Sequence, residues 1–172
     1  LKAFPTVQAL ATPPEPQGLK QWEGLGYYSR ARNLHKAAQV VTQEWGGQFP
    51  DSAAGLRQLP GIGEYTAGAV ASIAFNRREA AVDGNVIRVL SRVLGIRENM
   101  RLPAARKRLS QMAGQMVDEA RPGDFNQAMM GLGALICTPR RGDCEQCPVE
   151  KWCDARAVGD ALELPVLPPP VD

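Results

Sequence analysis

The stretch from Leu59 to Ala67, with the sequence LPGIGEYTA, constrains the fold more than any other part of the chain. Two glycines flank one apolar residue directly after Pro60, which predicts a tight turn that opens a helix. The almost uncharged run 66–75 follows, and it predicts a buried central helix. Free N–H groups at a helix start attract a phosphate, and glycines let another backbone approach closely. The stretch therefore predicts a helix-hairpin-helix that grips a nucleic-acid backbone without reading its sequence.

Apolar residues recur at helical spacing along nearly the whole chain, and no segment shows sustained strand alternation. The pattern predicts an all-α fold. Its helices are expected at 7–11 after a Thr6 cap, 19–25, about 30–45, 51–59 with Asp51 as cap, 66–75, 86–95, from Pro103 to about 120, and 125–137. His35, on the polar side of its helix, is expected at the surface, whereas Trp22, Trp45 and Trp152 are expected in the core.

Charge is unevenly distributed along the 172 residues, although the net charge is only +2. Residues 1–153 hold 19 basic and 14 acidic side chains, and the last 19 residues hold one arginine and four acids. A mildly basic body suits DNA binding without requiring it. No apolar run reaches membrane-spanning length and no signal peptide opens the chain, so we expect a soluble intracellular protein that is not bound to a membrane.

All four cysteines lie near the C-terminus, spaced Cys137-x6-Cys144-x2-Cys147-x5-Cys153. Such clustering in an intracellular protein favours a metal site over disulfides. Zinc usually takes two tight cysteine pairs, and only one C-x2-C is present, so an iron–sulfur cluster is the better interpretation and zinc remains open. On the residues alone, Arg140 and Arg141 between the first two cysteines indicate an ordinary solvated loop.

A short acidic turn separates the predicted central helix from the next one. Asp83 precedes the apolar run that begins at Val86, and an aspartate in such a turn usually caps the following helix. Asn85 is typical of a turn. On the residues alone, Tyr65 fits core packing and Tyr27 fits a half-buried surface position.

Five motifs together resemble the MutY-type adenine DNA glycosylases of the helix-hairpin-helix, or endonuclease III, superfamily. They are LPGIGEYTA at 59–67, VDGNV at 82–86, WEGLGYYSRARNL at 22–34, FNQAMMGLG at 125–133 and the cysteine spacing, and the resemblance covers roughly residues 4–157. It implies a helical six-helix barrel lobe over 1–121 with the hairpin at about 56–75. A helix with a [4Fe–4S] cluster loop is implied over 122–157, and a Pro-rich tail or linker over 158–172.

The resemblance also implies an activity and a set of partners. Such enzymes flip adenine out of double-stranded DNA, where it is mispaired with 8-oxoguanine or guanine, and hydrolyse its N-glycosidic bond. The chain is accordingly expected to be a monomer in the cytoplasm, associated with the nucleoid. A lysine in endonuclease III-like enzymes attacks the sugar where this chain has Tyr65, so hydrolysis without strand cleavage is expected here.

Residue roles follow from the same resemblance, position by position. Asp83 would stabilise positive charge on the sugar, and Asn85 and Tyr65 would orient groups at that site. Other matched residues would contact DNA (Tyr27 as a wedge in the base stack, Gly61, Gly63, Arg140 and Arg141) or ligate the cluster (Cys137, Cys144, Cys147 and Cys153).

One departure from the family pattern affects catalysis. The glutamate that protonates adenine in the family lies upstream of the matched residues, and Glu15 and Glu23 lie in the wrong segments to replace it. A general acid contributes typically about 10²–10⁴-fold, so we expect the sequence as given to be a poor catalyst. The C-terminal 8-oxoguanine-recognition domain is not matched either. A non-catalytic DNA-binding core, an endonuclease III-like glycosylase/lyase and a zinc protein are the alternatives.

Overall fold

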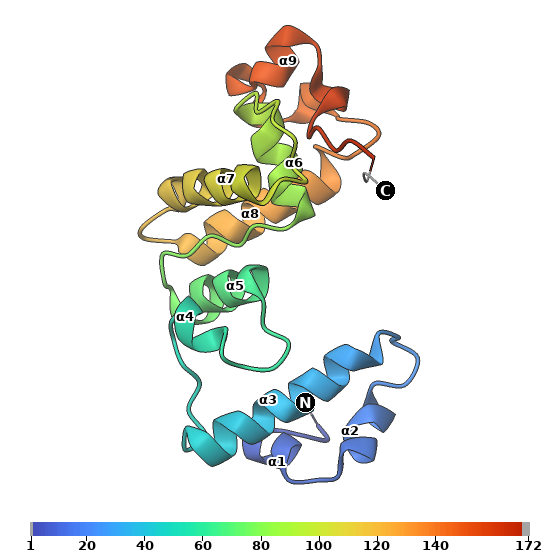
Figure 1. Cartoon of the computed structure of the whole chain (residues 1–172), viewed down its shortest axis with the longest axis vertical. Helices are drawn as coiled ribbons and strands as arrows, with labels where there is room; N and C mark the ends of the chain where they lie inside the picture. Colours follow the sequence, from blue (N-terminus) through green and yellow to red (C-terminus); the bar gives the residue numbers. More distant parts are fainter. Residues whose placement is uncertain (1, 170–172) are drawn as a thin grey trace. The chain divides into compact units, whose positions relative to one another are not determined.

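The computed structural model describes residues 2–169 (Figure 1). Its helices are α1 (Val7–Ala11), α2 (Glu15–Gln21), α3 (Tyr28–Glu44), α4 (Ala53–Leu56), α5 (Glu64–Phe75), α6 (Gly84–Val93), α7 (Pro103–Met116), α8 (Pro122–Leu135) and α9 (Asp154–Val158), with short 3-10 turns at Cys144–Gln146, Glu150–Trp152 and Ala161–Glu163. Within the described part of the chain only isolated β-bridges occur, at Asn99 with Val166 and at Cys137 with Gly142. The predicted all-α fold class is confirmed.

The chain divides into two compact units, and the division falls inside α5 after Ala67. In the first unit, α3 packs against α1 and α2. The Thr6 hydroxyl accepts a hydrogen bond of 3.1 Å from the Ala9 N–H and caps α1, as predicted. Ser52 rather than Asp51 caps α4, because its hydroxyl accepts from the Gly55 N–H at 3.1 Å.

The buried side of α3 differs from the predicted one at His35. This side chain is only 5% exposed, on the same side as the small residues Ala31 and Ala38. The expectation of a surface histidine was wrong, because the His35 Nε2 lies 2.9 Å from the Pro13 carbonyl oxygen and so has a polar partner inside. Leu34, the residue before His35, is exposed although it is apolar.

The second unit is built around α6, which packs against α7, α8 and α9. The apolar side of α6 joins α7 and the segment before it in one core, formed by Val86, Leu90, Met100, Ala105, Leu109 and Ala113. Proline opens both α7 and α8, where its missing N–H has no cost. Burial of these side chains fixes α6, and with it the residues that flank its N-terminus.

Helix α5 is buried on one side only, although its sequence is apolar all round. Ser72 and Ala71 are buried while Ile73 is exposed, so the prediction of a buried central helix holds for one side only. The buried side receives Asn126 of α8, whose amide donates to the Ser72 hydroxyl at 2.8 Å and to the Glu79 carbonyl at 2.8 Å. Its amide oxygen accepts from the Ala81 N–H at 3.1 Å, so Asn126 ties three segments together.

The tryptophans expected in the core lie further out than predicted. Trp152, at the end of the 3-10 turn Glu150–Trp152, is 72% exposed. Trp22 and Trp45 are half-buried. The core of the molecule is accordingly built from aliphatic side chains, methionine and alanine.

Residues 164–168, expected as part of a tail or linker, form no helix and pack against other parts of the second unit. Leu164 is buried, its carbonyl accepts from the Arg92 Nε at 3.0 Å, and the Val166 carbonyl accepts from the Met100 N–H at 2.9 Å. The predicted tail also includes residues 170–172, which lie outside the described residues.

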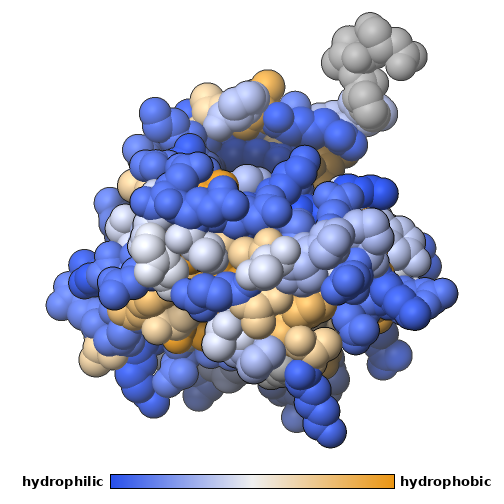
Figure 2. Space-filling view, turned by 90° about the horizontal axis from the view of Figure 1, so that it is seen from below, coloured by the Kyte–Doolittle hydropathy of each residue, from blue (hydrophilic) through white to orange (hydrophobic). Residues whose placement is uncertain are grey.

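Figure 2 shows one face of the molecule, on which hydrophilic residues predominate and hydrophobic areas lie between them. Between residues 2 and 169, no helix combines the length and the apolar character that crossing a bilayer requires.

Candidate functional site

Asp83 occupies the N-cap position of α6, so the capping role expected from its turn is present. One carboxylate oxygen, Oδ1, accepts from the Val86 N–H at 2.8 Å. The other, Oδ2, accepts from the Asn85 side-chain amide at 3.1 Å. An ionised carboxylate offers about four acceptor sites, so two hydrogen bonds leave capacity for a ligand. The structure thus brings together two of the predicted site residues, and both line a pocket with Leu164 and Leu167.

Arg88 connects this acidic turn to the first cysteine. Its Nη2 donates to the Asn85 Oδ1 at 2.7 Å and to the Gly133 carbonyl at 2.6 Å, while its Nε donates to the Cys137 carbonyl at 2.7 Å. The side chain is only 8% exposed. Burial, and to a lesser degree the charge of Arg92, lowers the pKa of Arg88. A chain of hydrogen bonds therefore runs from the cysteine segment through Arg88 and Asn85 to Asp83.

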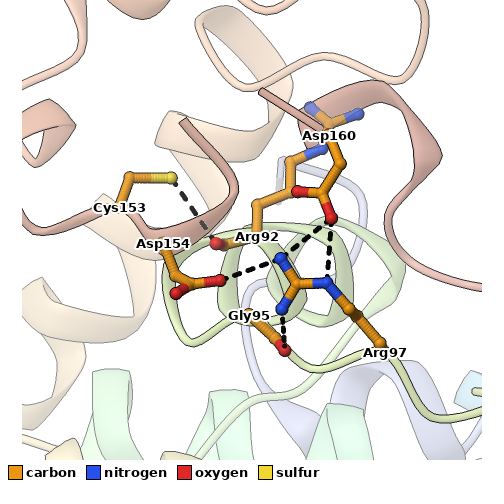
Figure 3. Close-up of polar contacts among 6 residues, drawn as sticks. All are labelled: Arg92, Gly95, Arg97, Cys153, Asp154 and Asp160. Atoms are coloured by element: carbon orange, nitrogen blue, oxygen red, sulfur yellow. Dashed lines mark hydrogen bonds and ion pairs between the residues drawn. The ribbon is translucent and has the colours of Figure 1, made fainter. Parts of the chain in front are cut away.

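Arg92, one helical turn further along α6, also contacts the segment around Cys137. Its Nη1 lies 3.3 Å from the Cys137 sulfur and donates to the Thr138 carbonyl at 2.8 Å. Its Nε donates to Leu164, as described above, and its own carbonyl lies 3.5 Å from the Cys153 sulfur (Figure 3). The burial of these two arginines was not predicted from the sequence. The spacing of Asn85 and Arg88, three apart on one helix, was the available signal.

The four cysteines line one pocket, with Arg92 and apolar side chains of α6 and α8 around it. Burial raises the pKa of the Cys147 thiol, and the other three cysteines raise it further. Across residues 2–169, no three His, Cys, Asp or Glu side chains are arranged to hold a single metal ion. The four thiols lie around the same pocket and so form one candidate metal site.

Arg97 fastens the segment after the last cysteine to the end of α6. Its guanidinium pairs with Asp154 at 3.0 Å and with Asp160 at 2.8 Å, and its Nη1 donates to the Gly95 carbonyl at 2.9 Å (Figure 3). Because Asp154 directly follows Cys153, this arrangement limits the movement of the fourth cysteine.

The loop between the first two cysteines presents two arginines. Arg140 and Arg141 are both exposed, and together with Arg156 they line an open pocket. The Thr138 hydroxyl donates to the Arg141 carbonyl and closes the loop. Two adjacent exposed guanidinium groups can bind phosphate oxygens.

The predicted hairpin is present in the first unit, between α4 and α5. The Ile62 N–H donates to the Leu59 carbonyl at 3.2 Å, and Gly61 has φ +78°. A Cβ on Gly61 would lie 2.6 Å from the side chain of Asn33, whereas a Cβ on Gly63 would meet nothing within 4 Å. Gly61 is thus required for the turn, while Gly63 leaves the backbone open to an outside group.

Two tyrosines of the first unit complete the predicted set. Tyr65 lies in the first turn of α5 and is 41% exposed, so it is not a core residue. Tyr27 precedes α3, is 81% exposed and has a left-handed backbone with φ 47° and ψ 53°. Large side chains adopt this conformation rarely, and such positions concentrate at functional sites.

Comparison with known proteins agrees with these features. Residues 1–115 match the HhH-GPD superfamily base excision DNA repair proteins. The human adenine DNA glycosylase is 51% identical over 157 residues, which is 91% of this chain and 29% of that protein. The enzyme of the same name from Schizosaccharomyces pombe is 40% identical over 90% of this chain and 34% of its own length. The chain thus spans about a third of the length of these relatives.

Solved structures show the same fold. A thermostable thymine-DNA glycosylase superposes with a TM-score of 0.81 and 31% identity, over 91% of this chain and 72% of that chain. An endonuclease III in a non-covalent complex with DNA gives a TM-score of 0.75 at 23% identity, over 92% of this chain and 72% of that chain, and supports the fold alone. With its hairpin, its capping aspartate and its match over residues 1–115, this chain belongs to the HhH-GPD superfamily of base excision DNA repair proteins.

Proposed function

We propose that this chain is the core of a DNA glycosylase that removes adenine mispaired with 8-oxoguanine or guanine in double-stranded DNA. The observation that carries the proposal is the Asp83–Asn85 pair, which begins α6 in a chain about half identical to an adenine DNA glycosylase. The reaction is hydrolysis of the N-glycosidic bond after the adenine is turned out of the duplex.

Asp83 is the proposed catalytic carboxylate. Loss of adenine leaves positive charge on the sugar, and a carboxylate beside that carbon stabilises the charge as it develops. Both oxygens of Asp83 are held by donors in the same turn, Val86 N–H and the Asn85 amide. Because the carboxylate is fixed before substrate arrives, little reorganisation is needed when the bond breaks. Asn85 is a positioning residue for this carboxylate, and Arg88 orients Asn85 in turn.

Tyr65 gives the enzyme its monofunctional character in this proposal. Its phenol can donate a hydrogen bond to the substrate but cannot form the Schiff base that a lysine amine forms. Water, rather than a nucleophile of the enzyme, therefore adds to the sugar carbon that carried the adenine. The strand is left uncut with an abasic sugar.

DNA is held without sequence readout at several places. Gly61 and Gly63 let the hairpin backbone approach a phosphate, and the N-terminus of α5 presents backbone N–H groups there. Arg140 and Arg141 supply charge for another part of the backbone. Tyr27 is the proposed wedge that enters the base stack and helps the adenine leave it.

The cysteine pocket fits a [4Fe–4S] cluster. The four thiols, which are the ligands such clusters use, surround one pocket, and Arg92 beside the Cys137 sulfur offers a positive charge to a thiolate. Cys137, Cys144, Cys147 and Cys153 would be the ligands. A bound cluster would supply cross-linking of the C-terminal segment, and the chain's own residues carry out the glycosylase steps.

Adenine release from defined duplexes tests the proposed function. Single-turnover release is compared for adenine opposite 8-oxoguanine, opposite guanine and opposite thymine, with the 172-residue chain and with a form extended at its N-terminus to include the family's glutamate. We expect release from the first two duplexes only. Borohydride trapping on the same duplexes is expected to yield no covalent adduct, and an adduct would show a lyase instead. Mispair binding without any release from either form would favour a non-catalytic DNA-binding protein.

A further inference from the structure

The loop that carries Tyr27 has an unusual backbone. Gly24, Gly26 and Tyr27 all have positive φ, at +82°, +66° and +47°. The glycines adopt this conformation without steric conflict, whereas Tyr27 requires support from its surroundings. An exposed tyrosine in this conformation is therefore held by neighbouring groups.

Trp22 provides the first of these supports. Its indole Nε1 donates to the Gly26 carbonyl at 2.9 Å, and its carbonyl accepts from the Leu25 N–H at 3.1 Å. The Tyr27 carbonyl accepts from the Arg30 N–H at 3.0 Å, which joins the loop to the first turn of α3. These bonds fix the backbone of Tyr27 but do not fix its ring.

Arg30 is placed to hold the ring. Its guanidinium carbon lies 5.4 Å from the centre of the Tyr27 ring and 5.5 Å from the centre of the Trp22 ring. Both distances lie within the range of about 6 Å for attraction between a cation and an aromatic face. In the described part of the chain, Arg30 forms no ion pair with a carboxylate, so its charge is directed to the two rings. Arg30 thus joins an exposed tyrosine to a half-buried tryptophan.

We propose that Arg30 is a positioning residue for Tyr27, and that its contact with Trp22 and Tyr27 holds the tyrosine ring ready to enter the base stack of DNA. This inference rests on the proposed function. A tyrosine has two side-chain torsions, and restricting them before DNA arrives lowers the entropy that must be lost on insertion. The contact of Arg30 with the two rings is present in the free protein, without DNA. It therefore affects the insertion of Tyr27 into the base stack, which precedes any chemical step.

A direct contact between Arg30 and a DNA phosphate is the competing explanation, and the two differ in a measurable way. Each phosphate contact contributes about −0.9 to the slope of log K against log salt concentration. A residue that acts through Tyr27 leaves that slope unchanged. A residue that acts through Tyr27 also loses its effect when Tyr27 is removed, whereas independent contacts add.

The test uses Arg30→Ala, Arg30→Lys, Tyr27→Ala and the double variant in the 172-residue chain. Arg32→Ala is the matched control, because Arg32 is an exposed arginine two positions later that faces Glu15. Binding is measured over a range of salt with a duplex that carries 2-aminopurine beside the mispair, since its fluorescence rises when the base is unstacked. Circular dichroism of each variant checks that α3 is intact.

We expect Arg30→Ala to weaken mispair binding about 3- to 10-fold and to reduce the fluorescence rise, with the salt slope unchanged. Arg30→Lys should recover part of both, and the double variant should behave as Tyr27→Ala does. Additive effects, or a salt slope reduced by about one, would overturn the positioning role. A wild-type chain that binds the mispair without unstacking it overturns the wedge and the proposal together. Normal unstacking in both wild type and Arg30→Ala overturns this inference alone.

Discussion

Replacement of Arg88 by methionine tests the connection between the cysteine segment and the acidic turn. The substitution keeps an unbranched side chain of similar length and a similar helix propensity, but it removes every donor. Three acceptors then lose their partner, namely the carbonyls of Cys137 and Gly133 and the Asn85 Oδ1. Because Arg88 is only 8% exposed, water can reach these acceptors poorly.

The expected cost follows from that geometry. Each buried acceptor left without a donor costs about 1–3 kcal/mol, and removing the buried charge returns part of the total. We therefore expect Arg88→Met to lower the free energy of unfolding by about 2–5 kcal/mol. For a protein of this size, that corresponds to a fall in Tm of roughly 5–15 °C.

Urea denaturation followed by far-UV circular dichroism measures this free energy. Arg108→Met is the matched control, since Arg108 lies on a helix, is exposed and pairs with Glu98 at the surface. A change of about 0.5 kcal/mol or less is expected for the control. An equally small change for Arg88→Met would refute the hydrogen-bonded connection, because one buried and two half-buried acceptors cannot lose their donor at so little cost.

Three further perturbations test other parts of the molecule. Gly61→Ala should weaken binding to any duplex roughly tenfold in a fluorescence anisotropy titration, because its Cβ would meet Asn33 and its φ is positive; unchanged affinity would contradict the hairpin assignment. Asn126→Ala should destabilise the protein by about 2–4 kcal/mol in thermal unfolding, since it leaves several buried polar groups unpaired, and a Tm within about 1 °C of wild type would show that these bonds contribute little. Cys144→Ser should lower iron per chain and bleach the brown colour of the purified protein, and iron content equal to wild type would argue against the cluster.

Periodicity and turn chemistry predicted most of the helices, and short-range rules predicted their caps. Thr6 caps α1 and Pro103 begins α7, as the sequence indicated, because both effects depend on residues within one turn. Ser52 was missed in favour of Asp51, since both are good caps and only the geometry of the loop selects between them. Such choices between neighbouring residues lie beyond a pattern-based argument.

The positions that the sequence did not predict depend on contacts across the fold. His35 can be buried because its ring nitrogen lies within hydrogen-bond distance of the Pro13 carbonyl oxygen, more than twenty residues away in the sequence. No local sequence pattern predicts that contact. Arg88 and Arg92 are buried because the cysteine segment brings backbone carbonyls to them. In the candidate site, Asp83 and Asn85 lie two positions apart in the sequence, so their pairing could be predicted, whereas their link to the cysteines required the structure.

The most direct test of the proposed enzyme is the effect of Asp83→Asn on adenine release opposite 8-oxoguanine, measured under single-turnover conditions in the N-terminally extended form. Asparagine is also a good N-cap, so α6 should form and DNA binding should stay near normal. Asp118→Asn is the matched control, because Asp118 also accepts backbone N–H bonds in a turn, from Ala120 and Arg121. We predict that Asp83→Asn abolishes release while the control keeps it. Release by Asp83→Asn at the rate of the control would contradict the account, because the charge on the sugar would then be stabilised elsewhere.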